Sequence, residues 1–169
     1  MVKAIAMVVT FALLAVAARA ALHVTLTADT GKLLSRCRNC GPGAYPDSAT
    51  VHQSSRSPSS TWEMTIVGDD KIMLKSNNGK YLARCNGCWS GGAYPDSAFV
   101  HATSQQSYST WTVVGHADGK ISLKSDTGKY LARCNGCVPG GAYPDSAFVH
   151  ISDPNLPYAK WAVTYVSST

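Results

Sequence analysis

The 169-residue sequence lacks the patterns on which several common protein classes depend. After residue 20, no segment is apolar enough to cross a bilayer, and no stretch of useful length shows a helical period. Charged residues make up only 15% of the chain and are scattered, so no basic stripe indicates a nucleic-acid partner. Neither G-x-S-x-G nor H-E-x-x-H occurs, and no cysteine stands alone as a nucleophile. We therefore expect a protein that is not an enzyme, has no cofactor and has no membrane span.

The first twenty residues have the pattern of a secretory signal peptide. Lys3 supplies a positive start, residues 4–17 are apolar and uncharged, and Ala18-Arg19-Ala20 places small residues at the cleavage positions. Cleavage removes one lysine and one arginine, which lowers the formal net charge from +5 to +3. The sequence thus predicts a secreted, extracellular protein, with residues 21–169 forming one domain large enough for a real core.

A threefold internal repeat dominates the mature chain. From Gly31, Gly79 and Gly128 the sequence reads GKLLSRCRNCGPGAYPDSATVH, GKYLARCNGCWSGGAYPDSAFVH and GKYLARCNGCVPGGAYPDSAFVH. The tyrosine of the YPDSA segment recurs every 49 residues, as does the histidine of the Val-His pair, and a tryptophan follows each copy. One supersecondary unit has therefore been built three times, in repeats of approximately 21–70, 71–119 and 120–169.

Each repeat has the pattern of four short strands. In the second copy, residues 71–75 and 80–84 alternate polar and apolar positions on either side of Asn77-Asn78-Gly79, which is typical of a β-hairpin. Further strands are predicted at 98–102 and 110–114, and residues 22–26 open the first copy. Roughly twelve strands in three units favour a closed barrel with threefold pseudosymmetry. An open solenoid would leave exposed edges, and propellers usually need more blades.

The motif L-K-S-x-x-G-K-Y-L-A-R, at 74–84 and 123–133 and followed by a tryptophan, resembles the repeat of fascin-like and related lectin-like β-trefoil domains. The resemblance covers essentially the whole mature chain and implies an all-β, pseudo-threefold trefoil of three repeats of about 49 residues. The first copy departs at Leu33, where the others carry tyrosine, and the C-x-x-C pairs and YPDSA segments are additions to the pattern. In such a barrel Leu74, Leu82, Val100 and Trp111 are predicted to be core, with their counterparts, which include Trp62 and Trp161.

Six cysteines form three C-x-x-C pairs: Cys37 and Cys40, Cys85 and Cys88, and Cys134 and Cys137. In a secreted chain this number argues for disulfides, and threefold repetition favours a bridge within each pair. Two alternatives stay open. Each pair is half of a tetrahedral zinc site that a nearby histidine or aspartate would complete, and C-x-x-C also serves redox chemistry, although there in a βαβ context.

The remaining recurrent polar residues are the candidate ligand-binding set, to which we add one tryptophan. We group the tyrosine, aspartate and histidine of each copy into one loop pocket, because carboxylates accept bonds from sugar hydroxyls and aromatic rings pack on pyranose faces. The set comprises Tyr45, Asp47 and His52; Tyr94, Asp96 and His101; Tyr143, Asp145 and His150; and Trp89, in a glycine-rich loop and expected to be exposed. Alternatively, the aspartates only brace their loops, the histidines are packed strand residues and Trp89 is a chance surface aromatic.

These patterns predict a secreted, multivalent, lectin-like protein that binds a glycan or polysaccharide at up to three equivalent sites. A structural matrix, wall or coat protein is the main alternative. A protease inhibitor and an actin-bundling relative of fascin are further ones, the latter disfavoured by the signal peptide. Self-association is left open.

Overall fold

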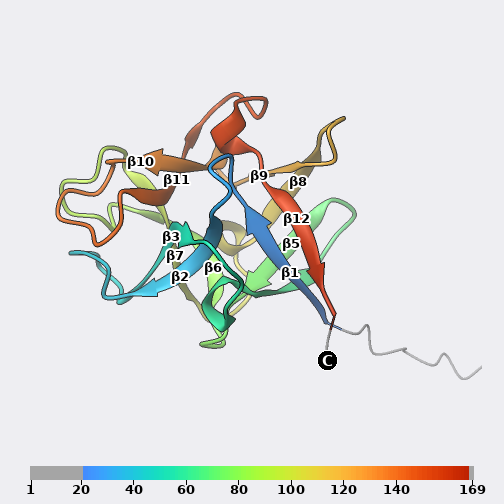
Figure 1. Ribbon diagram of the computed structural model, residues 1–169, viewed down its shortest axis with the longest axis horizontal. Helices are drawn as coiled ribbons and strands as arrows, with labels where there is room; N and C mark the ends of the chain where they lie inside the picture. The colour runs from blue at the N-terminus through green and yellow to red at the C-terminus, as the bar shows by residue number, and fades with distance from the viewer. Residues whose placement is uncertain (1–20, 168–169) are drawn as a thin grey trace, which may run out of the picture.

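The computed structural model describes residues 21–167, so the predicted signal peptide lies outside the described residues. This part of the chain forms twelve β-strands and three short 3-10 helices (Figure 1). The first repeat contains β1 (Leu22–Thr27), β2 (Leu33–Arg38), β3 (Asp47–Gln53), η1 (Pro58–Ser60) and β4 (Trp62–Ile66). The second contains β5 (Lys71–Lys75), β6 (Tyr81–Asn86), β7 (Asp96–Ala102), η2 (Ser107–Ser109) and β8 (Trp111–Gly115). The third contains β9 (Ile121–Lys124), β10 (Tyr130–Asn135), β11 (Asp145–Ile151), η3 (Pro157–Ala159) and β12 (Ala162–Val166).

Six of these strands close a barrel. Antiparallel pairing runs from β12 to β1, then to β4, β5, β8 and β9 in turn. A bridge between Ile121 and Trp161 joins β9 back to the start of β12, so no strand of the ring is left with a free edge. The two described chain ends lie together at one end of this barrel (Figure 1).

The other six strands form three hairpins that cap the barrel: β2–β3, β6–β7 and β10–β11. Single bridges connect β3 to β7, β7 to β11 and β11 to β3, which closes a triangle around the pseudo-threefold axis. A six-stranded barrel capped by three hairpins is the β-trefoil architecture, and the predicted all-β trefoil is confirmed. The predicted strands of the second repeat match the observed strands to within two residues at each end.

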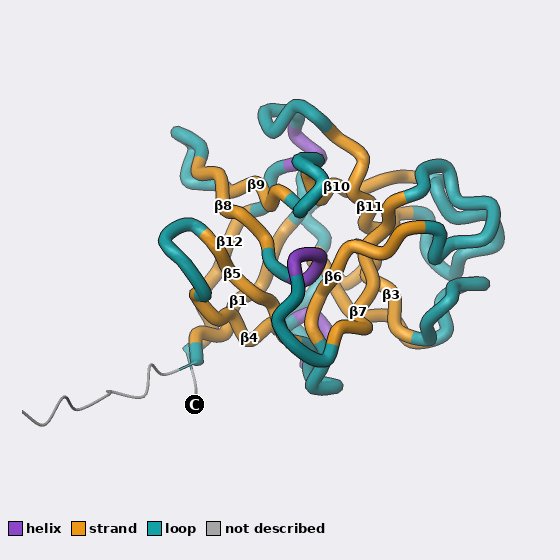
Figure 2. The backbone as a smooth tube through the Cα atoms, turned by 180° about the vertical axis from the view of Figure 1, so that it is seen from behind, coloured by secondary structure: helices purple, strands orange, loops and turns teal. Residues whose placement is uncertain are grey.

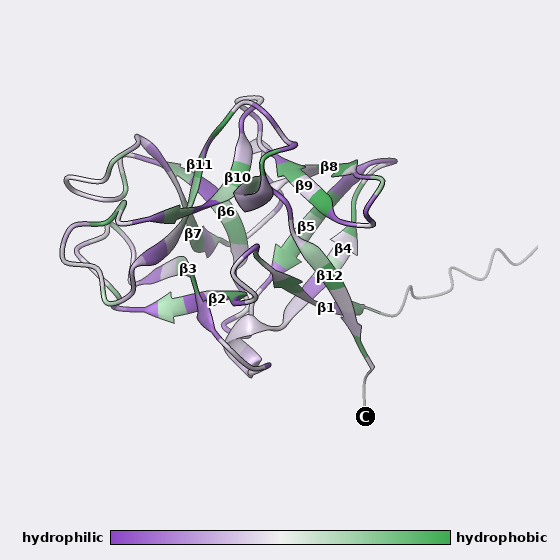
Figure 3. Ribbon diagram, turned by 45° about the horizontal axis from the view of Figure 1, so that its top comes forward, coloured by the Kyte–Doolittle hydropathy of each residue, from purple (hydrophilic) through white to green (hydrophobic). Residues whose placement is uncertain are grey.

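The core lies between barrel and cap, and it contains the predicted residues. Trp111, Leu74, Leu82 and Val100 are at most 1% exposed, as are their counterparts in the other repeats. Figure 3 shows apolar residues concentrated along strands such as β5, β6 and β9. Each core tryptophan also uses its indole N–H, which donates to the carbonyl oxygen of a cap-strand leucine at 3.1 Å: Trp62 to Leu34, Trp111 to Leu82, and Trp161 to Leu131. The tryptophans therefore join barrel to cap by packing and by a hydrogen bond.

Trp89 lies in a second apolar cluster, under the hairpin tips. It is 6% exposed and its ring centroid is 4.9 Å from that of Phe99, so the expectation of an exposed aromatic is wrong. The loop of the first repeat is one residue shorter and carries Gly41, where an added Cβ would lie 2.7 Å from the Trp89 ring. Thr50 stands where the other repeats have Phe99 and Phe148. Trp89 fills the space that these smaller residues leave near the axis.

We expect Trp89→Ala to lower the free energy of unfolding by about 3–5 kcal/mol, the usual cost of truncating a buried aromatic. Trp89→Phe should cost less, because the indole Nε1 has no hydrogen-bond partner in the described residues and its loss removes a buried unpaired donor. Tyr165→Ala, at a position 65% exposed, is the control and should change stability by no more than about 0.5 kcal/mol. Chemical denaturation measures the stability of all three variants. A Trp89→Ala variant with a nearly unchanged free energy of unfolding would contradict the burial.

Candidate functional site

The tips of the three cap hairpins meet at the end of the molecule opposite the chain termini (Figures 1 and 2). A ring of three backbone hydrogen bonds joins these loops, residues 39–46, 87–95 and 136–144. In each bond an alanine N–H donates to a cysteine carbonyl oxygen of the next repeat: Ala44 to Cys88 at 2.8 Å, Ala93 to Cys137 at 3.0 Å, and Ala142 to Cys40 at 2.7 Å. We call this set the cross-loop ring. Because the tyrosine of each YPDSA segment directly follows the donor alanine, the ring places each tyrosine over the neighbouring repeat.

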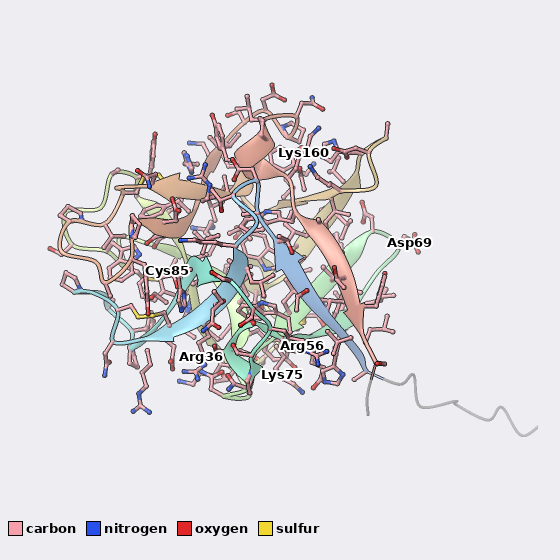
Figure 4. All side chains as sticks on the ribbon, in the orientation of Figure 1. Arg36, Arg56, Asp69, Lys75, Cys85 and Lys160 are labelled. Carbon is pink, nitrogen blue, oxygen red and sulfur yellow. A yellow bond between two sulfur atoms is a disulfide. The ribbon has the colours of Figure 1, made fainter. Side chains whose placement is uncertain are left out.

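Disulfides hold the acceptor side of the cross-loop ring. Cys37–Cys40, Cys85–Cys88 and Cys134–Cys137 are bridged, as predicted, and no free cysteine occurs in residues 21–167. Figure 4 labels Cys85 near the hairpin tips. Inside each bridge one residue adopts positive φ and its N–H donates to a proline carbonyl oxygen across the loop: Asn39 to Pro46, Gly87 to Pro95, and Gly136 to Pro144. Glycine and asparagine suit this left-handed conformation.

Each candidate histidine occupies a β-bulge. Between β6 and β7, Tyr81 pairs with Ala102 and Leu82 pairs with Val100, which leaves His101 as the extra residue. The same shift isolates His52 between β2 and β3, and His150 between β10 and β11. A bulge bends the strand and redirects a side chain, and bulges are over-represented beside functional sites. Here it leaves each imidazole half-buried on the flank of the cap.

The structure brings each histidine together with a tyrosine from the preceding repeat. Site 1 is Tyr143 with His52, site 2 is Tyr45 with His101, and site 3 is Tyr94 with His150. The ring centroids are 4.0, 4.5 and 4.2 Å apart, with interplanar angles of 17°, 18° and 25°. Every one of these tyrosines is between 38% and 43% exposed. The grouping of a tyrosine with the histidine of its own copy is therefore wrong: the pairs form between copies.

The aspartates of the YPDSA segments belong to a separate network. An arginine of the same repeat pairs with each carboxylate: Arg36 with Asp47 at 2.6 Å, Arg84 with Asp96 at 2.8 Å, and Arg133 with Asp145 at 2.9 Å. The Nε of the same guanidinium donates to a turn residue of the next repeat: Asn77, Asp126 or Asp29. Since these three aspartate side chains are only 9–14% exposed, this geometry favours the loop-bracing interpretation over direct ligand contact. Figure 4 labels Arg36.

The three sites share a plan and differ in their edges. In site 2, Tyr108 lies parallel to His101 with centroids 5.9 Å apart, so the imidazole lies between two tyrosines. In site 1, Thr50 bonds His52 Nδ1 at 2.7 Å, whereas Nδ1 of His101 and of His150 is buried without a partner in the described residues. Sequence reasoning missed Tyr108, the bulges and the arginines. The recurrence of Arg36, Arg84 and Arg133 just before the first cysteine of each pair was the available signal.

Burial lowers the pKa of His52, His101 and His150 below the ordinary value of 6.5. The neighbouring backbone of Phe99 and Phe148 raises the pKa of His101 and His150 and so opposes this effect, while the positive charge of Lys32, Lys80 and Lys129 adds to the lowering at His52, His101 and His150 respectively. The three imidazoles are therefore neutral at pH 7. In sites 2 and 3 the imidazole leaves Nε2 beside the exposed phenol ring, whereas both ring nitrogens of His52 are already bonded, to Thr50 and Gln53.

No protein-family model and no curated sequence matches this chain at a significant level. Solved structures do match, and they show the β-trefoil fold. The designed threefold-symmetric protein ThreeFoil aligns over 83% of this chain and 96% of its own, at 21% identity and a TM-score of 0.64. An SDF2-like protein from Arabidopsis thaliana aligns over 85% and 92%, at 16% identity and a TM-score of 0.66.

A third solved structure is the Polyporus squamosus lectin bound to the glycan Neu5Acα2-6Galβ1-4GlcNAc. It aligns over 86% of this chain at 13% identity and a TM-score of 0.64, and this chain spans about half of its length, 49%. Within residues 21–167, no helix is long and apolar enough to span a bilayer.

The histidine pKa values predict acid sensitivity in a defined range. Below about pH 6.5 the unfolded chain takes up protons at these positions while the native state does not, so the free energy of unfolding must fall as pH falls toward the native pKa values. The slope is at most about 1.4 kcal/mol per pH unit for each histidine. Replacing all three by glutamine should flatten the stability curve below about pH 6.5. Denaturation at several pH values measures the slope, and equal slopes in parent and variant would refute this assignment.

Proposed function

We propose that this protein is a secreted, multivalent carbohydrate-binding protein, without catalytic activity, whose ligand contacts sites 1–3. The carrying observation is the repeated Tyr–His stack: a tyrosine that stays about 40% exposed on a half-buried histidine, three times around one axis. The stacked histidine fixes the plane of the tyrosine ring and covers one of its faces, so the exposed part of the ring is left to solvent. Such a fixed aromatic face suits the apolar face of a pyranose, while the phenol, and in sites 2 and 3 the imidazole Nε2, can bond to sugar hydroxyls.

Two further observations support the proposal. The fold is shared with the Polyporus squamosus lectin, a glycan-binding protein, although at 13% identity this likeness reaches the architecture alone. Three disulfides in a small domain are compatible with an extracellular location, where glycans are abundant. The aspartates, which pair with arginines, act here as braces that hold the tyrosine loops rather than as acceptors for sugar hydroxyls.

Repetition gives the proposed function its strength. Three exposed tyrosines recur around one pseudo-threefold axis, one at each site, so they can engage separate branches or chains of a polysaccharide. Sites that are weak singly then gain affinity through effective concentration. A structural protein built from the same braced cap would not depend on the tyrosine faces, and this difference can be tested.

We expect Tyr94→Ala to remove site 3 and to lower avidity for an immobilised polysaccharide by about tenfold. Replacing Tyr45, Tyr94 and Tyr143 together should abolish retention, because every aromatic face is lost. Tyr165→Ala, which removes an exposed tyrosine from barrel strand β12, is the matched control and should bind like the parent. A glycan array with neutral and acidic members supplies the ligand, and surface-based binding measures the affinity.

A second comparison separates binding from bracing. Asp96→Asn weakens the ion pair with Arg84, so it should lower the melting temperature while the folded variant keeps most of its affinity. A triple tyrosine variant that folds and still binds every glycan bound by the parent would overturn the proposed sites. A parent that binds no glycan on the array would overturn the function and leave the structural role.

A further inference from the structure

We propose that sites 1–3 select acidic saccharides, those bearing carboxylate or sulfate groups, over neutral ones, because a lysine accompanies each Tyr–His stack and the nearby carboxylates are bound by arginines. This inference rests on the proposed function and names its ligand class. The charged and polar groups around the three stacks that are not engaged elsewhere support it together.

The lysine of each Gly-Lys turn lies beside a site histidine. Tyr81 pairs with Ala102 at the edge of the bulge. Lys80 directly precedes Tyr81, and His101 directly precedes Ala102. Lys32 stands in the same relation to His52, and Lys129 to His150. The electrostatic effect of each lysine on its histidine pKa agrees with this placement. Lys32 and Lys80 are half-exposed, whereas Lys129 is exposed.

The carboxylates near the cap face arginines rather than these lysines. Arg84 and Arg133 each hold two carboxylates, whereas Arg36 holds Asp47 and the neutral Asn77, so the positive excess is largest at site 2, beside Lys80. Within residues 21–167, seven of the ten acidic residues are ion-paired, and the YPDSA aspartates are among them. The three other acidic residues lie away from the cap or accept hydrogen bonds from a neighbouring residue. Asp69 and Asp70 are on the turn between β4 and β5 of the barrel, and Asp153, in the loop after β11, accepts two hydrogen bonds from Asn155. No lysine of the three sites has an ion-pair partner among the described residues.

The groups that remain at every site are the lysine ammonium, which can only donate, and the tyrosine hydroxyl; sites 2 and 3 add the imidazole Nε2. A neutral sugar presents hydroxyls, which are best held where a site also supplies strong acceptors. A carboxylate or sulfate presents acceptors only, and hydrogen bonds to an ionised group are about twice as strong as neutral ones. The donor-rich site, with its fixed aromatic face, therefore matches an acidic sugar ring.

The experiment compares three immobilised polymers: a polyuronate, a sulfated glycan and a neutral glucan. The full, oxidised protein should prefer one or both acidic polymers by at least about tenfold and lose that preference as salt rises. Replacing Lys32, Lys80 and Lys129 by glutamine should remove the preference. The control replaces Arg56, Lys71 and Lys120 by glutamine: it has the same net charge, lies outside the three sites, and should keep at least half of the preference.

The outcomes separate the two proposals. Loss of acidic selectivity in the site variant alone supports this inference, and the polymer retained identifies carboxylate or sulfate as the group read. Equal loss in both triple variants would show binding by net charge alone and overturn it. Tyrosine-dependent binding that is equally tight on the neutral glucan would overturn the acidic selectivity and leave the proposed function intact. Failure of the parent to bind any of the three polymers would overturn the acidic selectivity, and the glycan array then decides the proposed function separately.

Discussion

The cross-loop ring is the interaction on which the rest of the cap depends. Each of its three hydrogen bonds runs from one repeat to the next, so none can form in an isolated repeat. The disulfide fixes the carbonyl that accepts the bond, the bond fixes the alanine that donates it, and the next residue is the site tyrosine. A local constraint of four residues is thereby converted into a contact between repeats. The short bridges restrict the unfolded chain little, and positioning is their main effect.

The threefold plan is broken where the loops meet the axis. Three identical large side chains cannot all occupy the same point, so the repeats divide the space unequally. The first contributes Gly41 and Thr50, the second contributes Trp89, and the third contributes Val138, which is also buried. The outer surface is not limited in this way, and there the Tyr–His stacks repeat closely. Packing thus requires asymmetry inside, while the three Tyr–His stacks can remain alike.

Much of the fold could be predicted, because strand alternation, turn residues and threefold repetition all indicate the same architecture. The core tryptophans and the disulfide pairing followed from the same repetition. For the site, the sequence could predict which tyrosines and histidines take part but not which tyrosine meets which histidine. A spacing of 49 residues is the same whether a tyrosine meets the histidine of its own repeat or that of the next, so the sequence cannot distinguish the two. The burial of Trp89 also depends on the shorter loop of the first repeat. It is therefore set by how the loops of all three repeats pack together and not by the Trp89 loop alone.

The most direct test of this account is amide hydrogen exchange in the oxidised protein, at the N–H groups of Ala44, Ala93 and Ala142. These loop-tip amides should exchange slowly because each is bonded across to the next repeat. After selective reduction of the C-x-x-C pairs in a protein that stays folded, all three should exchange much faster, and ring contacts between each tyrosine and its partner histidine should weaken in nuclear Overhauser spectra. Fast exchange in the oxidised protein, or protection and ring contacts unchanged by reduction, would contradict the account.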